Sequence, residues 1–267
     1  MTTYTETGSG RAQGILWSRR AADWADVQEG QSRALFDAVL ERVPPSSGNV
    51  LLDVGCGAGG FCERAAARGF RVAGFDAADE LIAIARRRLR LADFHRGDME
   101  ALPHPAGTFD AVTGINAFQY AADPVHALAE ARRVAKPGAP VVIATWGRAD
   151  CCEASGYLAA LGSMLPPPPP GTPGPFALSD PAALRTFATR AGLHGEDTTE
   201  VSVVWQYADL SNALRGLLSV GPAARAIDAA GEPAVRDAVT HAIAPYRTST
   251  GAYRLENVFT FLVARAT

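Results

Sequence analysis

The chain of 267 residues has few cysteines and lacks a long apolar run. Its four cysteines are Cys56, Cys62, Cys151 and Cys152, a spacing that fits neither a disulfide framework nor a zinc site. We therefore expect no metal. The stretch from Met1 to Gly14 has no apolar core of a signal peptide, and no later stretch approaches the length of a membrane span. We expect a cytoplasmic protein with no membrane partner.

The chain also lacks a strong excess of charge. Its net charge is −3 and its isoelectric point is near 6.0, which gives no general attraction to phosphate backbones, so we expect no nucleic-acid partner. The run from Arg86 to Arg88 predicts a solvated helix face. A hydrophobic content of 48% is ample for a core. The oligomeric state is left open by these properties.

Glycine is abundant in one place, directly after an apolar run. Residues 50–54 read as a short strand, and residues 61–68 continue as a helix that Gly69 ends. Four glycines and Asp53 lie at the junction. Glycine is favoured there because any side chain would keep a ligand away from the backbone. The segment therefore predicts a strand that leads into a ligand-binding loop.

Two ligand classes fit this loop. Gly55, Gly57 and Gly60 satisfy the G-x-G-x-x-G pattern of dinucleotide-binding proteins. Asp53 argues against that class, because its carboxylate would face a pyrophosphate held at the helix N-terminus. A ligand that carries an ammonium group suits it better.

The loop resembles the first motif of the class I S-adenosylmethionine-dependent methyltransferases, in which an acidic residue precedes G-x-G-x-G. The matching residues are Asp53, Gly55, Gly57 and Gly59, with Cys56 and Ala58 at the variable positions. The resemblance implies S-adenosylmethionine as cofactor.

Two further carboxylates lie at the ends of predicted strands. Asp76 ends the second strand and precedes Ala77; it could accept hydrogen bonds from both ribose hydroxyls, or cap the next helix, a role for which Asp79 competes. The pair Asp98-Met99 resembles the next motif of the family, which implies that Asp98 meets the adenine amino group and that Met99 lines the base. A turn-capping role for Asp98 is the alternative.

The resemblance continues to about residue 146 through residues 114–120 and 132–138. It implies that Asn116 lies near the methionine part of the cofactor. Phe118, Gln119 and Tyr120 would then lie near the acceptor, together with Trp146. Phe118 and Tyr120 could equally be core aromatics.

Strands and helices alternate along the first part of the chain, which favours a parallel sheet covered on both faces. We expect strands at 50–54, 71–75, 94–96, 109–115, 141–146, 201–207 and 253–263, and helices at 35–43, 61–68, 80–91, 125–134 and from Ser179 to Gly192. The predicted fold is α/β, a Rossmann-like seven-stranded, mostly parallel sheet with an antiparallel C-terminal edge and a helical cap.

We divide the chain into four parts. These are an N-terminal helical cap at 1–45, a cofactor-binding core at 46–147, a Pro-rich connector at 148–178 and a C-terminal completion of the core at 179–267, with a helical lid insertion at about 208–245. Trp17 and Trp24 lie seven residues apart in the cap. They could close over the cofactor or simply pack in the core.

No residue is diagnostic of a general base. Tyr120 and His241 are the candidates, but positioning alone can supply most of the acceleration of a methyl transfer. We expect transfer of a methyl group from S-adenosylmethionine to an oxygen, nitrogen or carbon atom of a small organic acceptor in specialised metabolism. A cyclase or non-catalytic protein that binds S-adenosylmethionine and an NAD-dependent oxidoreductase are the alternatives.

Overall fold

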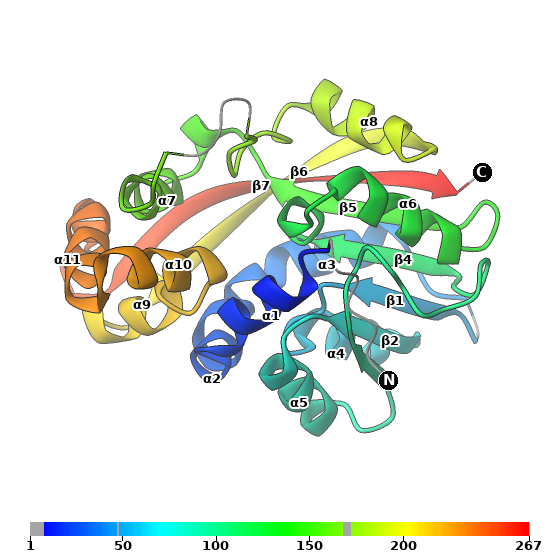
Figure 1. Ribbon diagram of the computed structural model, residues 1–267, viewed down its shortest axis with the longest axis horizontal. Helices are drawn as coiled ribbons and strands as arrows, with labels where there is room; N and C mark the ends of the chain where they lie inside the picture. Colours follow the sequence, from blue (N-terminus) through cyan, green and yellow to red (C-terminus); the bar gives the residue numbers. More distant parts are fainter. Residues whose placement is uncertain (1–7, 47, 168–171, 267) are drawn as a thin grey trace.

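The fold is built on one twisted seven-stranded sheet (Figure 1). The computed structural model describes residues 8–46, 48–167 and 172–266. The strands are β1 (Val50–Val54), β2 (Arg71–Asp76), β3 (Asp93–Arg96), β4 (Ala111–Ile115), β5 (Pro140–Trp146), β6 (Leu193–Tyr207) and β7 (Tyr253–Ala266). Their order is β3-β2-β1-β4-β5-β7-β6; β1 to β5 run parallel, and β7 is antiparallel to both β5 and β6. The predicted fold class is confirmed.

Helices cover both faces of the sheet because the strands are apolar on both sides. Leu51 belongs to a core cluster with residues of α3 (Arg33–Arg42), α4 (Gly60–Ala67) and α5 (Asp79–Arg88). Leu52, next in the chain, belongs to a second cluster with residues of α6 (Pro124–Val134) and α8 (Pro181–Arg190). Within the described ranges, no helix combines the length and apolar character needed to cross a membrane.

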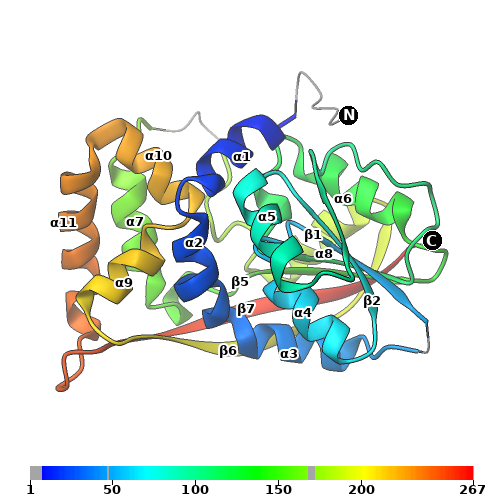
Figure 2. The same ribbon diagram turned by 90° about the horizontal axis from the view of Figure 1, so that it is seen from below.

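A helical lobe lies beyond one end of the sheet, carried by the long strands β6 and β7 (Figure 2). It contains α9 (Leu210–Leu217), α10 (Gly221–Ala230) and α11 (Glu232–Ile243), which confirms the helices predicted between about 208 and 245. The helix α7 (Ala154–Ser163) packs against α10 and α11.

The connector predicted over 148–178 is wrong in part, because α7 lies inside it. Tyr157 and Leu161 are four residues apart and both buried, so this stretch does form an apolar helix face. The proline run extends into residues 168–171, which lie outside the described residues.

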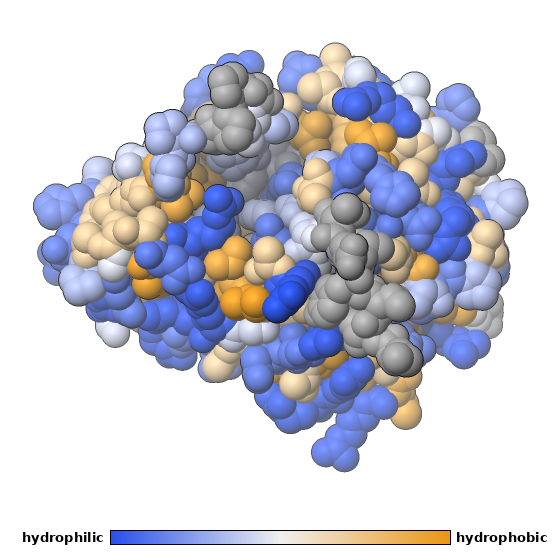
Figure 3. All heavy atoms as spheres, viewed as in Figure 1, coloured by the Kyte–Doolittle hydropathy of each residue, from blue (hydrophilic) through white to orange (hydrophobic). Residues whose placement is uncertain are grey.

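An N-terminal helical segment lies between the sheet and the lobe (Figures 1 and 2). It consists of α1 (Gly10–Ser18), α2 (Ala21–Asp23), the π-helical turn η1 (Trp24–Gln28) and the 3-10 turn η2 (Glu29–Ser32), after which α3 begins. We call residues 8–32 the cap. The helix α1 contacts both α5 and α10. Figure 3 shows apolar residues at the surface over α1, where Ile15 is 56% exposed.

Several predicted boundaries were wrong, among them the end of α5 and the start of β6. The helix α5 ends at Arg88, before Leu91, because Leu89 leaves the helical conformation with φ −130°. The strand β6 begins at Leu193, before Val201. The first half of this edge strand is largely exposed, so the residues there are polar and do not show the alternation of a half-buried strand.

Candidate functional site

A cavity of about 110 Å³ lies where the carboxyl ends of β1, β2 and β4 meet the cap. Its floor comes from the glycine loop and the strand ends, including Asp53, Gly55, Cys56, Gly57, Asp76, Ala77, Met99 and Asn116. The cap contributes Ser9, Gly10, Gln13, Trp17, Trp24, Glu29 and Ser32. The remaining wall includes Leu35, Phe36, Phe61, Ile115, Tyr120 and Phe259. No residue of 208–245 lines it, so that insertion reaches the cavity only through the cap; its role as a lid stays a prediction.

The glycine loop has a left-handed backbone at three of its glycines. Gly55, Gly57 and Gly59 have φ values of +75°, +56° and +84°, which favour glycine over other residues. A Cβ on Gly57 would lie 3.1 Å from Nε1 of Trp24. Gly59 does not line the cavity; it precedes α4, and a Cβ there would meet Ala85.

Asp53 lies at the cavity floor with only 2% of its surface exposed. The Thr113 hydroxyl donates to its Oδ1 at 2.7 Å. Burial raises the pKa of Asp53 to about 7; the hydrogen bond from Thr113 opposes this shift, whereas the carboxylates of Asp76 and Glu29 add to it.

Asp76 holds the glycine loop and the start of α5. Its Oδ2 accepts the backbone N–H of Gly57 at 2.9 Å, and its Oδ1 accepts that of Ala78 at 2.8 Å. The N-cap of α5 is Ala78, so Asp79 does not take the capping role for which it competed with Asp76. A carboxylate has about four acceptor positions, so Asp76 keeps capacity for hydroxyl groups in the cavity.

Glu29 was not predicted as a site residue. It is 5% exposed, and its Oε1 accepts the backbone N–H of Ala58 at 2.8 Å. It also accepts the N–H of Gly60, so a carboxylate from the cap lies at the N-terminus of α4. Arg88 pairs with Glu29, so the expectation that Arg86 to Arg88 form a purely solvated face is wrong for Arg88. Burial raises the pKa of Glu29, and Arg88 opposes that shift.

Asp98 lies under the start of α1 and does not line the cavity. It is 1% exposed; its Oδ2 accepts the backbone N–H of Gly10 at 2.9 Å, and its Oδ1 accepts that of Glu100 at 3.0 Å. Met99, which follows it, does line the cavity. The adenine role of Asp98 stays a prediction.

Asn116 and Tyr120 lie at the cavity, beyond the end of β4. Asn116 has φ +53°, the one left-handed non-glycine residue in the described chain. Such a conformation at a cavity wall is common at functional sites. Gln119 donates to its Oδ1 and does not itself line the cavity. Tyr120 meets Trp17 edge-on, with ring centroids 5.5 Å apart.

Two predicted acceptor residues belong to the core. Phe118 is 1% exposed and lies against Gly114, because glycine at that position leaves room for its ring. Trp146 is 5% exposed and stacks on Phe259 with centroids 4.5 Å apart. Phe259 lines the cavity, and Trp146 packs against the side of Phe259 that is turned away from it.

Neither candidate base is poised to accept a proton. His241 lies on α11, away from the cavity, and its Nδ1 is 2.8 Å from the carbonyl oxygen of Asp237 in the same helix. Burial raises the pKa of Tyr120 to about 12, so this hydroxyl stays neutral and acts as a donor. In the described ranges, no cluster of His, Cys, Asp and Glu side chains could hold a metal ion.

Trp17 and Trp24 both line the cavity, and their closure over a cofactor stays a prediction. Their rings meet edge-on with centroids 5.1 Å apart. The indole Nε1 of Trp24 is buried and has no hydrogen-bond partner. Trp24 therefore offers the cavity an unused donor.

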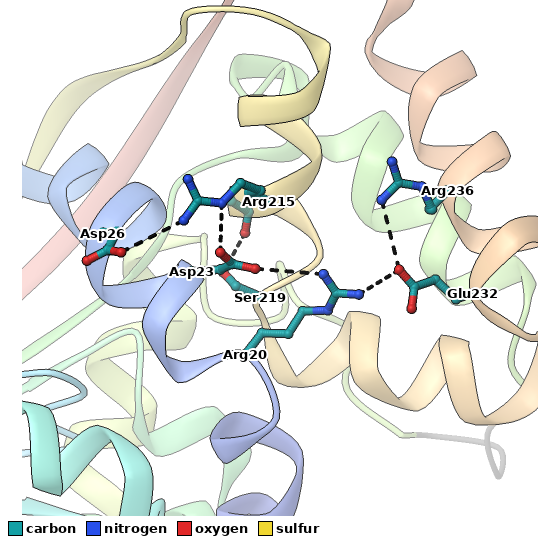
Figure 4. Close-up of polar contacts among 8 residues, drawn as sticks. Arg20, Asp23, Asp26, Arg215, Ser219, Glu232 and Arg236 are labelled. Carbon is teal, nitrogen blue, oxygen red and sulfur yellow. Dashed lines mark hydrogen bonds and ion pairs between the residues drawn. The ribbon is translucent and has the colours of Figure 1, made fainter.

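Ion pairs join the cap to the lobe (Figure 4). Arg215 of α9 lies 2.8 Å from Asp23, and Arg20 lies 2.6 Å from Glu232 at the start of α11. Arg20 also reaches Asp23 at 3.7 Å. The cap is thus attached on one side to the lobe and on the other, through Glu29, to the glycine loop.

Comparison with known proteins gives consistent results. Residues 52–143 match a family model described as a methyltransferase domain. A ubiquinone biosynthesis O-methyltransferase of Thiobacillus denitrificans is 34% identical over 58% of this chain and 68% of its own. A malonyl-[acyl-carrier protein] O-methyltransferase of Erwinia pyrifoliae is 28% identical over 81% of this chain and 78% of its own. The crystal structure of the [4+2]-cyclase SpnF has a similar fold, with a TM-score of 0.60 and 20% identity over 99% of this chain and 97% of that one.

Proposed function

Because the chain belongs to the class I S-adenosylmethionine-dependent methyltransferases that act on small molecules, we propose that its cavity binds S-adenosylmethionine next to the acceptor. The bound cofactor supplies a methyl group on a positively charged sulfur. In this proposal Asp53, Gly55, Gly57 and Asp76 hold the cofactor, together with Cys56, Ala77, Met99 and Asn116.

The negative charge of the cavity lining is the main support for this proposal. Glu29, Asp53 and Asp76 all line it, and no Lys, Arg or His of the described chain does. S-adenosylmethionine has a sulfonium and an ammonium group against one carboxylate, so its net positive charge suits this wall. The left-handed backbone of Gly55 and Gly57 leaves the close approach that a nucleoside ligand requires.

The same wall argues against a dinucleotide. A pyrophosphate would bind at the N-terminus of α4, but Glu29 already presents its carboxylate to the N–H groups of Ala58 and Gly60 there. Two anions cannot share these donors. The NAD-dependent alternative therefore lacks its phosphate site.

The cavity residues can position the reactants and exclude water. Trp17, Trp24 and Tyr120 cover the strand ends with apolar rings. Since Tyr120 is neutral and no histidine of the described chain lines the cavity, we propose that the protein accelerates transfer by orienting the acceptor and not by proton abstraction. The acceptor would belong to specialised metabolism and the protein to the cytoplasm.

The test is the transfer of an isotope-labelled methyl group from S-adenosylmethionine. The purified protein is incubated with a panel of phenols, amines and aromatic carbon nucleophiles, and the label in the small-molecule fraction is measured. We expect label in at least one extracted product. Label only in the protein fraction would contradict a small-molecule acceptor.

A second candidate keeps the cofactor but not the transfer. The absence of a basic side chain from the described cavity wall also suits a protein that binds S-adenosylmethionine and orients one substrate for cyclisation, the activity named for the SpnF structure. Tight binding of the cofactor without any label transfer would favour this candidate.

A further inference from the structure

Apart from its carboxylates and its glycines, most of the cavity wall is apolar and aromatic. Its apolar part is formed by Leu35 and Phe36 of α3, Phe61 of α4, Ile115 of β4, Tyr120 and Phe259 of β7, with Trp17 and Trp24 of the cap above. The other uncharged polar side chains of the lining are Ser9, Gln13, Ser32 and Asn116. This wall gives an acceptor rings to pack against but no positive charge.

Three cations of the cap and its surroundings, Arg20, Arg88 and Arg215, are already paired. Arg88 forms an ion pair with Glu29, and its Nη2 donates to the carbonyl oxygen of Ala25 at 2.7 Å. On the lobe side, Arg20 is tied to Glu232 and Arg215 to Asp23 (Figure 4). An anionic acceptor would have to break one of these pairs to gain Arg20, Arg88 or Arg215 as a partner.

The net charge of the site also disfavours an anionic acceptor. Glu29, Asp53 and Asp76 set three carboxylates against one guanidinium, that of Arg88. With Asp53 ionised, above its pKa of about 7, a cofactor of net charge one leaves the wall negative even after it binds. An acceptor with a carboxylate, sulfonate or phosphate would be repelled and would lose its water without compensation.

We propose that the acceptor presents no anionic group to this cavity and is an uncharged, ring-containing molecule with an oxygen that accepts a hydrogen bond. The inference rests on the proposed function and narrows its substrate class. The oxygen would meet a neutral donor at the wall, the Tyr120 hydroxyl. This donor suits an ester, ketone, ether or hydroxyl oxygen.

The experiment uses two probes with the same catechol ring, methyl protocatechuate, an uncharged ester, and protocatechuate, which carries a carboxylate. Each is titrated into the full-length protein saturated with S-adenosylhomocysteine, and binding is followed by saturation-transfer NMR. We expect the uncharged ester to bind at least about tenfold more tightly than the carboxylate. Binding of the acid as tightly as the ester, or of neither probe, would overturn the inference.

A charge variant tests whether the cavity wall causes the selection. Ser32→Arg adds a cation to the wall, whereas Ala34→Arg adds the same charge to an exposed position two residues later. We expect the ester-to-acid preference to fall at least about tenfold in Ser32→Arg and to stay unchanged in Ala34→Arg. Equal changes in both variants would contradict the claim that this wall causes the preference for the ester.

The outcomes separate the two proposals. If S-adenosylhomocysteine does not bind, the proposed cofactor site fails before either probe is added. If it binds and the acid is preferred, only the inference about the acceptor fails. If Ser32→Arg does not fold, the relative binding of the ester and the acid to the wild-type protein still tests the inference about the acceptor.

Discussion

Asp53 couples ligand binding to the stability of the protein. Its pKa in an unfolded chain is about 4, and burial in the folded protein raises it to about 7. Between these values the folded protein holds a proton that the unfolded chain has released, so the contribution of Asp53 to stability falls as the pH rises through this window.

We predict that Asp53→Asn is more stable than the wild type at about pH 8, by roughly 2–4 kcal/mol, and level with it near pH 4.5. Asparagine keeps the shape and can still accept from Thr113. The same variant should bind S-adenosylhomocysteine more weakly, because it lacks the charge. Thermal unfolding at both pH values checks the first half. Equal melting temperatures at pH 8 would show that burying the Asp53 carboxylate does not destabilise the protein.

Gly57 has a role that its backbone conformation alone does not explain. We predict that Gly57→Ala loses binding of S-adenosylhomocysteine, because the new Cβ enters the cavity 3.1 Å from Trp24 and 3.2 Å from Glu29. The matched control is Gly107→Ala, at φ +65° with nothing within 4 Å of the new Cβ. Each variant should lose about 1–2 kcal/mol of stability from the left-handed conformation. Calorimetric titration of both separates the two effects, and retained binding in Gly57→Ala would remove the loop from the ligand site.

Neither Tyr120 nor His241 is expected to act as a base. Once an acceptor is known, Tyr120→Phe and His241→Ala should each retain turnover within about tenfold, a barrier change near 1.4 kcal/mol. The reasons are the neutral hydroxyl of Tyr120 and the position of His241 outside the cavity. Steady-state kinetics with matched measurements of cofactor binding provide the test. A thousandfold loss of turnover in one variant, with binding intact, would identify that residue as the base.

At the scale of single residues, the sequence predicted the carboxylates at strand ends and missed a carboxylate that reaches the loop from a distant segment. Asp53 and Asp76 could be found because each ends an apolar run beside a turn. Glu29 stands among polar residues of the cap, and its burial depends on a long-range contact with the loop around Ala58 that no local pattern records. Phe118 was misplaced because its ring turns toward Gly114 and the core.

Among the elements, the contact between cap and lobe rests on ion pairs that are partly exposed. Arg215 has 47% of its side chain exposed and pairs with Asp23 at 2.8 Å. We predict that Arg215→Met costs less than about 1 kcal/mol of global stability but speeds amide hydrogen exchange in α9 and η1. Arg148→Met, which removes the exposed pair with Asp150 elsewhere, is the control. Unchanged exchange in α9 and η1 would mean that packing alone holds the cap against the lobe.

Element boundaries could be predicted from the sequence where one face is buried, and were missed where the environment changes along an element. The core strands β1 and β2 were predicted closely because they are apolar and end at turn residues. The start of β6 was missed because its edge half is polar. The helix α7 was missed because the nearby prolines suggested an extended chain, whereas its buried face consists of few, widely spaced residues.

On the scale of the whole molecule, the cavity lies between parts that are far apart in the sequence. The core supplies Asp53, Asp76 and the glycine loop, the cap supplies Glu29 and both tryptophans, and the lobe holds the cap from outside. The Rossmann-like core was predictable from the alternation of strands and helices. The way the cap closes the site was not, because it depends on the packing of two helical segments that flank the core in sequence.

The most direct measurement is a pair of calorimetric titrations of the wild-type protein, one with S-adenosylhomocysteine and one with NAD. Three carboxylates line the cavity and Glu29 occupies the N-terminus of α4, so we predict saturable one-to-one binding of S-adenosylhomocysteine and no binding of NAD. Binding of NAD, or failure of S-adenosylhomocysteine to bind, would contradict the assignment of this cavity to the cofactor.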